Sequence, residues 1–156
     1  MVIRICSLAA AQEAAEKAEG RLSVISITSD GDRDVVFRNR GNFDSILHLK
    51  FNDLQSEFDE EGIPYGRPIP GQKDFDGLKK FVDGLHCELL IVHCREGISR
   101  SAAVAAAIFE YRNRTDTLRT GQAFEPNRLV YELSCCELGI RPGNLSYKPS
   151  ADRRDA

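Results

Sequence analysis

The sequence contains no tryptophan, one methionine and three histidines, and no two of its five cysteines are spaced as CxxC. The scarcity of histidine and the absence of a CxxC pair disfavour a structural zinc site. The number of cysteines is odd and their spacing is irregular, which disfavours the disulfide framework of a small secreted protein. We therefore expect at least one cysteine to be free for chemistry.

Long apolar runs are also missing. No segment approaches the roughly 18 apolar residues of a membrane span, and the N-terminus lacks the continuous apolar stretch of a signal peptide. The net charge of -3 and the pI of about 5.7 give no sign of the basic excess that is typical of nucleic-acid-binding proteins. We expect a cytoplasmic protein with neither a membrane nor a nucleic acid as partner.

The length of 156 residues suits one domain with one core, and a hydrophobic content of 42% is ordinary for a globular chain. Short apolar segments alternate with helix-forming ones, which predicts an α/β fold with a mainly parallel central sheet and helices on both faces. We expect a single domain over residues 1–147 and a polar tail over residues 148–156. The expected strands are residues 2–6, 22–28, 45–51 and 88–93, and the expected helices are residues 9–19, 75–85, 101–112 and 129–138. Ser7 is the expected N-cap of the first helix.

The most informative segment follows the nearly all-apolar run at residues 89–92, which is typical of a central strand. It precedes an Ala-rich helix and reads His93-Cys94-Arg95-Glu96-Gly97-Ile98-Ser99-Arg100-Ser101. In a tight strand-to-helix loop, successive backbone N–H groups form an anion-binding nest at the positive helix N-terminus. Gly97 permits the loop's backbone conformation, and Arg100 can bind two phosphate oxygens at once. The positive electrostatic field at the helix N-terminus also favours a thiolate at Cys94.

These residues match the His-Cys-x5-Arg-Ser signature of the protein tyrosine phosphatase superfamily and resemble its small dual-specificity branch. The residue-by-residue match covers this loop, and the order of elements is compatible with the family over most of the chain. The resemblance implies a phosphatase P-loop between the central strand and the Ala-rich helix. It also implies that neither a metal nor another cofactor takes part, because Arg100 and the backbone amides stabilise the charge.

The resemblance assigns a role to each side chain of the motif. Cys94 attacks phosphorus and forms a thiophosphate intermediate, and Arg100 binds the phosphoryl oxygens. Ser101 donates a hydrogen bond to the departing thiolate, while His93 orders the loop and helps to keep the Cys94 pKa low. The backbone amides expected to line the phosphate cradle are those of Arg95, Glu96, Gly97, Ile98, Ser99 and Arg100.

The family also uses an aspartate from a separate loop as general acid. Asp53 is the best candidate, because it follows the strand predicted at residues 45–51 and should emerge at the same sheet edge as Cys94. Asp59, in an acidic run that looks solvated, and Asp44, expected at the wrong end of that strand, remain alternatives. The Trp-Pro-Asp motif of the tyrosine-specific branch is not possible, since the chain has no tryptophan.

The substrate expected from the resemblance is a phosphorylated protein, or a small phosphoester, bound in a shallow pocket. Two further hypotheses concern neighbouring residues. Arg67, in a loop with three Pro and three Gly at residues 62–71, could bind a substrate charge. Cys6 or Cys87 could form a disulfide with an oxidised Cys94. His48, His86, Cys135 and Cys136 are expected to be structural or surface residues.

Other functions stay open at this point. Low-molecular-weight phosphatases and arsenate reductases use a similar loop near the N-terminus, and rhodanese-like sulfurtransferases normally have a shorter one. An RNA 5′-phosphatase or an inositol phosphatase would be expected to carry more basic residues around the loop. A non-catalytic phosphate-binding module is the remaining alternative, although such relatives usually lose the cysteine or the arginine, and both are present here.

Overall fold

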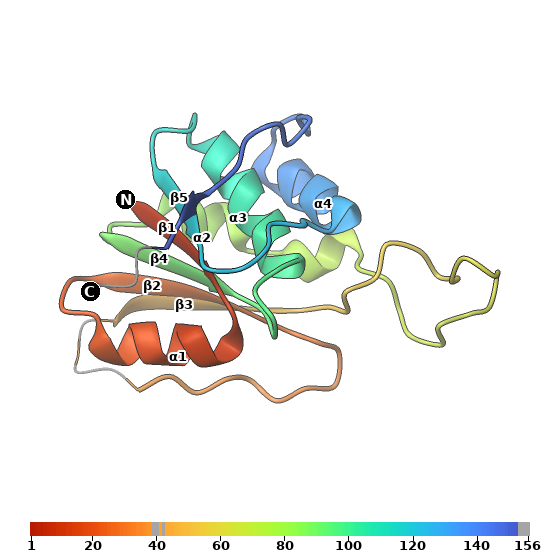
Figure 1. Ribbon diagram of the computed structural model, residues 1–156, viewed down its shortest axis with the longest axis horizontal. Helices are drawn as coiled ribbons and strands as arrows, with labels where there is room; N and C mark the ends of the chain where they lie inside the picture. Colours follow the sequence, from red (N-terminus) through yellow and green to blue (C-terminus); the bar gives the residue numbers. More distant parts are fainter. Residues whose placement is uncertain (39–40, 42, 153–156) are drawn as a thin grey trace.

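A computed structural model describes residues 1–38, 41 and 43–152. Its centre is a six-stranded sheet with the order β3-β2-β4-β1-β5-β6, in which every pair of neighbouring strands is parallel (Figure 1). The strands are β1 (Val2–Cys6), β2 (Leu22–Thr28), β3 (Phe43–Lys50), β4 (Leu89–His93), β5 (Thr117–Thr120) and β6 (Ser150–Ala151).

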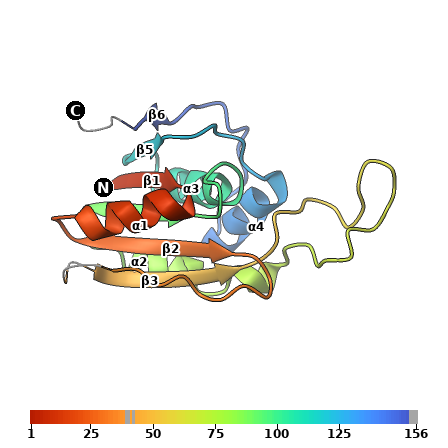
Figure 2. The ribbon, with the colours of Figure 1, turned by 60° about the horizontal axis from the view of Figure 1, so that its bottom comes forward.

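Helices cover both faces of this sheet, as predicted. One face carries α1 (Leu8–Lys17) alone, and the other carries the remaining helices (Figures 1 and 2). These are α2 (Leu78–Asp83), α3 (Arg100–Tyr111) and α4 (Arg128–Leu138), with a short 3-10 helix, η1 (Gln72–Phe75), before α2. The prediction of an α/β fold is thus confirmed.

Successive side chains of a strand point to opposite faces of the sheet, so the apolar side chains form two cores. Ile3 and Ile5 of β1 face the larger core under α2, α3 and α4, whereas Cys6 faces the smaller core under α1. The alanines of α3 let this helix approach the sheet closely, because small side chains take little room between a helix and a strand. Every residue from Arg100 to Ile108 is buried.

Several elements differ from the prediction in their bounds. The third strand begins two residues earlier than expected, at Phe43, and ends at Lys50. The helix predicted at residues 75–85 is divided into η1 and α2, because Gly77 takes a φ of 88° in the left-handed region and interrupts the helical path. The predicted cap at Ser7 is confirmed, since its side chain accepts the Ala10 amide.

Two strands were not predicted. β5 has one buried apolar residue, Leu118, and β6 is two residues long, so neither produces a hydrophobic period. β6 lies in the segment predicted to be a polar tail, and pairs Ser150 and Ala151 with β5. The tail residues 153–156 lie outside the described residues. None of the described helices is long and apolar enough to cross a membrane.

Strand register brings three loops to one edge of the sheet. Cys6 at the end of β1 pairs with His93 at the end of β4, and His93 pairs in turn with Ser26 of β2. The connection from β1 runs over one face to β2, while that from β4 runs over the other face to β5. In parallel α/β sheets, ligands bind where neighbouring connections diverge in this way.

A long excursion separates β3 from η1. Residues 55–66, here called the arm, project away from the body of the molecule (Figures 1 and 2). The arm contains no helix, and its main regular feature is a single antiparallel bridge between Phe58 and Pro64. The loop predicted at residues 62–71 is also free of helix and strand up to the start of η1.

Candidate functional site

The loop between β4 and α3, residues Cys94–Ser99, lies against the start of α1. This segment is called the Cys94 loop below. Gly97 has a φ of 72°, and a Cβ at this position would lie 2.4 Å from the backbone carbon of Cys6 and 2.4 Å from the Ser7 nitrogen. The Leu8 amide also donates to the Arg95 carbonyl at 3.2 Å. The glycine is therefore required for both its backbone angle and its close approach.

A second segment holds the loop from the opposite side. The amides of Glu125 and Asn127 donate to the carbonyls of Ile98 and Ser99 at 3.1 and 3.2 Å. Asn127 also caps α4, because its side-chain oxygen accepts the Val130 amide at 3.1 Å. The Cys94 loop is thus fixed by backbone contacts on both flanks.

Within this frame the Cys94 thiol is buried and faces hydrogen-bond donors. Its Sγ lies 3.1 Å from Ser101 Oγ and 3.3 Å from the Gly97 amide nitrogen. Burial acts to raise the pKa of Cys94, but hydrogen bonds from the Ser101 hydroxyl, from the Ser101 and Gly97 amides, and the charge of Arg100 outweigh it, so that the pKa is lowered. The geometry therefore favours the thiolate, as the sequence predicted.

His93 is buried behind the loop in a defined tautomer. Burial is the main cause that lowers its pKa, so the ring is neutral at pH 7. Nδ1 lies 3.2 Å from the Cys94 carbonyl, which can only accept, so Nδ1 carries the proton. Nε2 must then accept from the Ser26 hydroxyl, 2.7 Å away. Phe37 closes the site edge-on, with 5.5 Å between ring centroids.

Arg100 reaches across the ends of two strands. Its Nη1 donates to Ser29 Oγ at 2.9 Å and to the Phe51 carbonyl at 3.0 Å. In the part of the chain that the structure describes, its buried Nε finds no hydrogen-bond partner. An unpaired buried donor is costly, so this nitrogen has capacity for a ligand oxygen.

The N-terminus of α3 lies at the Cys94 loop, and its Ser101 amide donates to the Cys94 sulfur. No side chain among the described residues caps this helix, because the Ser99 hydroxyl donates instead to Asp53 Oδ1 at 2.9 Å. Uncapped amides at a helix N-terminus attract anions. Arg100 Nε and these amides therefore belong to one electropositive region around Cys94.

The structure brings Asp53 to the Cys94 loop, as expected. Its Oδ1 accepts from Ser99 Oγ and, at 2.8 Å, from Asn127 Nδ2. The carboxylate remains exposed and lines a cavity together with Ser99 and Asn127. Asp53 is thus held at the edge of the loop while one face stays open to solvent.

The two alternative aspartates have structural contacts elsewhere. Asp59 Oδ1 accepts the amides of Glu61 and Ile63 at 2.9 and 2.8 Å, which organises the turn of the arm. Asp44 pairs with Arg21 at 2.5 Å near the beginning of β3. Since the Cys94 loop follows the end of β4, Asp44 lies at the opposite edge of the parallel sheet, as expected.

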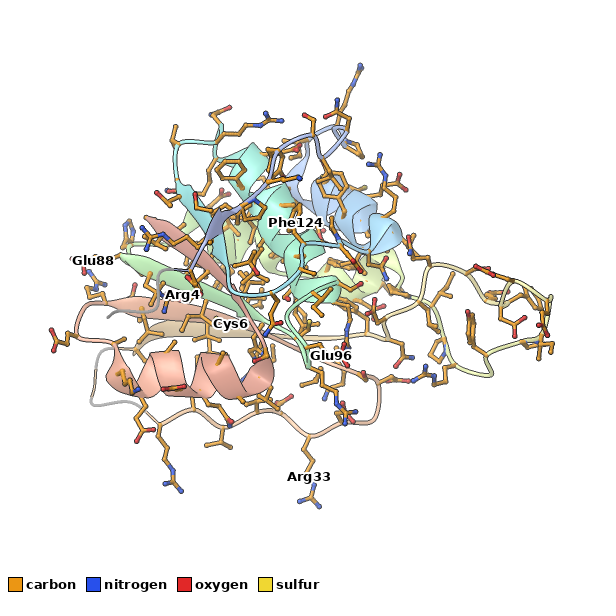
Figure 3. All side chains as sticks on the ribbon, in the orientation of Figure 1. Arg4, Cys6, Arg33, Glu88, Glu96 and Phe124 are labelled. Carbon is orange, nitrogen blue, oxygen red and sulfur yellow. The ribbon has the colours of Figure 1, made fainter. Side chains whose placement is uncertain are left out.

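Two adjoining cavities lie on the α1 side of the loop. One, of about 280 Å³, is lined by His93, Arg95 and Arg100 among others. The second, of about 250 Å³, is lined by Arg67 and Arg95 with Asp30 and Asp32. The structure therefore places Arg67 beside the Cys94 loop, a position from which it could bind a substrate charge. Two carboxylates lie in the same cavity. Glu96 is exposed at the sheet edge (Figure 3).

The structure does not bring the proposed redox cysteines to Cys94. Cys6 packs in the core under α1 and Cys94 in the core under α3, so the sheet separates the two thiols. Burial raises the pKa of Cys6 to about 12, which disfavours its thiolate. Cys87 Sγ lies 3.6 Å from Met1 Sδ, at the other end of β4. Disulfide protection of Cys94 by either residue therefore has no support.

Sequence reasoning missed three residues of this region, Ser26, Ser29 and Asn127. The two serines lie at the end of β2 and bind His93 and Arg100, which are far from them in the sequence. No local sequence pattern therefore marks them. Asn127 was detectable, because it follows a proline and lies two residues before the first residue of the last predicted helix, where Asn is a preferred cap.

Within the described residues, no three His, Cys, Asp or Glu side chains gather where they could hold a metal ion. Comparison with family models, with curated proteins and with solved structures finds no match to this chain. The functional argument therefore depends on the geometry and chemistry of the Cys94 loop.

The contact at Gly97 predicts a large loss of stability in Gly97→Ala. The added methyl would meet backbone that cannot rotate away, and the positive φ adds strain, so the free energy of unfolding should fall by about 2 kcal/mol or more. Gly121→Ala is the control, because its Cβ would come no closer than 3.7 Å to another residue. Equal unfolding midpoints in urea for the two variants would contradict this packing.

The contact between Ser26 and His93 predicts a shift in the Cys94 pKa. Removing the hydroxyl in Ser26→Ala frees the His93 tautomer and weakens its bond to the Cys94 carbonyl, which should raise the Cys94 pKa by about half a pH unit. The pH dependence of iodoacetamide alkylation, followed by mass spectrometry on the peptide that contains Cys94, measures it. Ser23→Ala removes another buried β2 hydroxyl, which contacts Ser45 at 3.1 Å, and should leave the profile unchanged.

Proposed function

We propose that this chain is a cysteine-dependent phosphatase of the protein tyrosine phosphatase type, which hydrolyses phosphomonoesters through a thiophosphate intermediate on Cys94. One observation carries the proposal: the buried Cys94 thiol lies just before the N-terminus of α3, and its pKa is lowered by hydrogen bonds and by the charge of Arg100, whose Nε has no hydrogen-bond partner among the described residues. A phosphoryl group supplies what each of these groups lacks, an electrophile for the thiolate and oxygens for the donors. The loop acts as the phosphatase P-loop in this account.

In the first step the Cys94 thiolate attacks phosphorus. An S–P bond forms while the bond from phosphorus to the ester oxygen breaks, and Asp53 gives its proton to that leaving oxygen. Arg100 Nε and the loop amides stabilise the negative charge on the equatorial oxygens. Nη1 is already bound to Ser29 and Phe51, so the guanidinium is oriented before substrate arrives.

In the second step water attacks the thiophosphate. Asp53, now a carboxylate, removes a proton from this water as its oxygen bonds to phosphorus, and the S–P bond breaks. The electron pair returns to Cys94, where the Ser101 hydroxyl and the Gly97 amide stabilise the thiolate. The products are inorganic phosphate and the original enzyme, so a single cysteine completes the cycle.

The decisive test is hydrolysis of p-nitrophenyl phosphate with a chelator present. Wild type should turn over, Cys94→Ser should be inactive, and Arg100→Lys should lose about 10²- to 10³-fold in kcat because lysine cannot bind two oxygens in a fixed fork. Arg33→Lys is the matched control, since Arg33 is exposed and points away from the body (Figure 3). If wild type binds tungstate but does not hydrolyse the ester, the chain is a phosphate-binding module and not a phosphatase.

The assignment of Asp53 predicts a dependence on the leaving group. Asp53→Asn keeps an oxygen for Ser99 and Asn127 but cannot donate the proton, so kcat for phosphotyrosine should fall about 10²-fold or more. The loss should be smaller for p-nitrophenyl phosphate, whose leaving group needs less protonation. Asp44→Asn should behave as wild type. An equal loss of kcat for both substrates in Asp53→Asn would show that Asp53 is not the general acid.

A further inference from the structure

The arm exposes an unusual combination of side chains. Phe58, Ile63 and Tyr65 are 49%, 55% and 47% exposed, and they belong to a projection that carries many carboxylates (Figure 3). Between Lys50 and Arg67 the sequence has five acidic residues, Asp53, Glu57, Asp59, Glu60 and Glu61, and no basic residue. Large exposed aromatic side chains on a protruding segment often mark an interaction surface.

Hydrogen bonds organise the arm in advance of any binding. The Tyr65 amide donates to the Glu57 carbonyl at 3.1 Å, and the Asp59 amide donates to the Ile63 carbonyl at 2.9 Å. The Asp59 carboxylate then holds the turn between these pairs. Because the arm is already ordered, a partner that binds there loses little free energy in ordering it.

A groove connects the arm to the Cys94 loop. It has a volume of about 450 Å³ and is lined at one end by Ser99 and Asn127 and at the other by Phe58 and Tyr65. Three carboxylates face it, those of Asp53, Asp59 and Glu60, and the described residues that line it include neither Lys nor Arg. The cavities on the other side of the loop differ, because they contain Arg67 and Arg95.

We propose that this groove binds the basic flank of a phosphorylated peptide segment, with Lys or Arg side chains against its carboxylates and aromatic rings. Charge complementarity selects this occupant, because the groove carries only negative formal charge and cations also bind over aromatic faces. A polyanion would be repelled by the same residues. The inference rests on the proposed function and deepens it: the substrate is a phosphoprotein with basic residues beside the phosphorylated side chain.

The test compares three phosphotyrosine peptides that differ only in flanking residues, Arg/Lys, Ala or Glu. Wild-type kcat/KM should rank basic above neutral above acidic, by about fivefold between basic and neutral at low salt, and the preference should shrink in high salt. The double variant Asp59→Asn/Glu60→Gln neutralises two carboxylates of the groove; it should lose most of this preference while retaining wild-type turnover of p-nitrophenyl phosphate. The matched control is Glu13→Gln/Glu16→Gln on α1, which should keep the preference.

Peptide binding to Cys94→Ser, measured by fluorescence anisotropy, separates the two proposals. The same rank order in this variant supports the groove even if no peptide is hydrolysed, whereas turnover of p-nitrophenyl phosphate with no flank preference in either assay overturns the groove alone. An equal loss of preference in the α1 control would also overturn it, because the effect would then come from net charge rather than from the arm.

Discussion

The site depends on one close contact, in which the backbone at Gly97 lies directly against the Cys6–Ser7 peptide. Only a residue without Cβ can fit there, and only at a positive φ. This contact turns the chain back within a few residues of β4, so that the amides of Gly97 and Ser101 point at the Cys94 sulfur instead of into solvent. The contacts from Glu125 and Asn127 close the other side. The loop is therefore ordered by its surroundings before a ligand binds.

Two opposing effects meet at Cys94, and their balance gives the site its chemistry. Burial alone raises a thiol pKa, as the buried Cys6 and Cys135 show, with values of about 12 and about 11. Cys94 is buried as well, yet its pKa is lowered, because donors converge on its sulfur. Charge on Arg100 contributes in the same direction. The same donors that stabilise a thiolate would stabilise phosphoryl oxygens, which connects the two halves of the proposed mechanism.

The sequence was most informative where local chemistry determines structure. The apolar run before Cys94, the Ser7 cap and the placement of Asp53 after β3 follow from periodicity, capping and strand direction, and the structure agrees with each. The strand β5 was missed because it has one buried apolar residue and so shows no hydrophobic period. The division of a helix at Gly77 was missed because it depends on the backbone angle φ of one residue. Ser26 and Ser29 could not be assigned, because only the register of β2 beside β4 brings them to His93 and Arg100. The side of the sheet that Cys6 occupies is likewise a property of packing: Cys6 lies in the core under α1 and Cys94 in the larger core, which gives the redox hypothesis no support.

The central claim is that Cys94 becomes phosphorylated in each turnover, and trapping that intermediate tests it most directly. Wild type would be mixed with p-nitrophenyl phosphate, quenched rapidly, digested and analysed by mass spectrometry. The account predicts one phosphoryl group on the peptide that contains Cys94, in greater amount in Ser101→Ala, where the thiolate leaves without its hydroxyl donor. Turnover with no phosphoryl group on Cys94 in either protein would contradict the account.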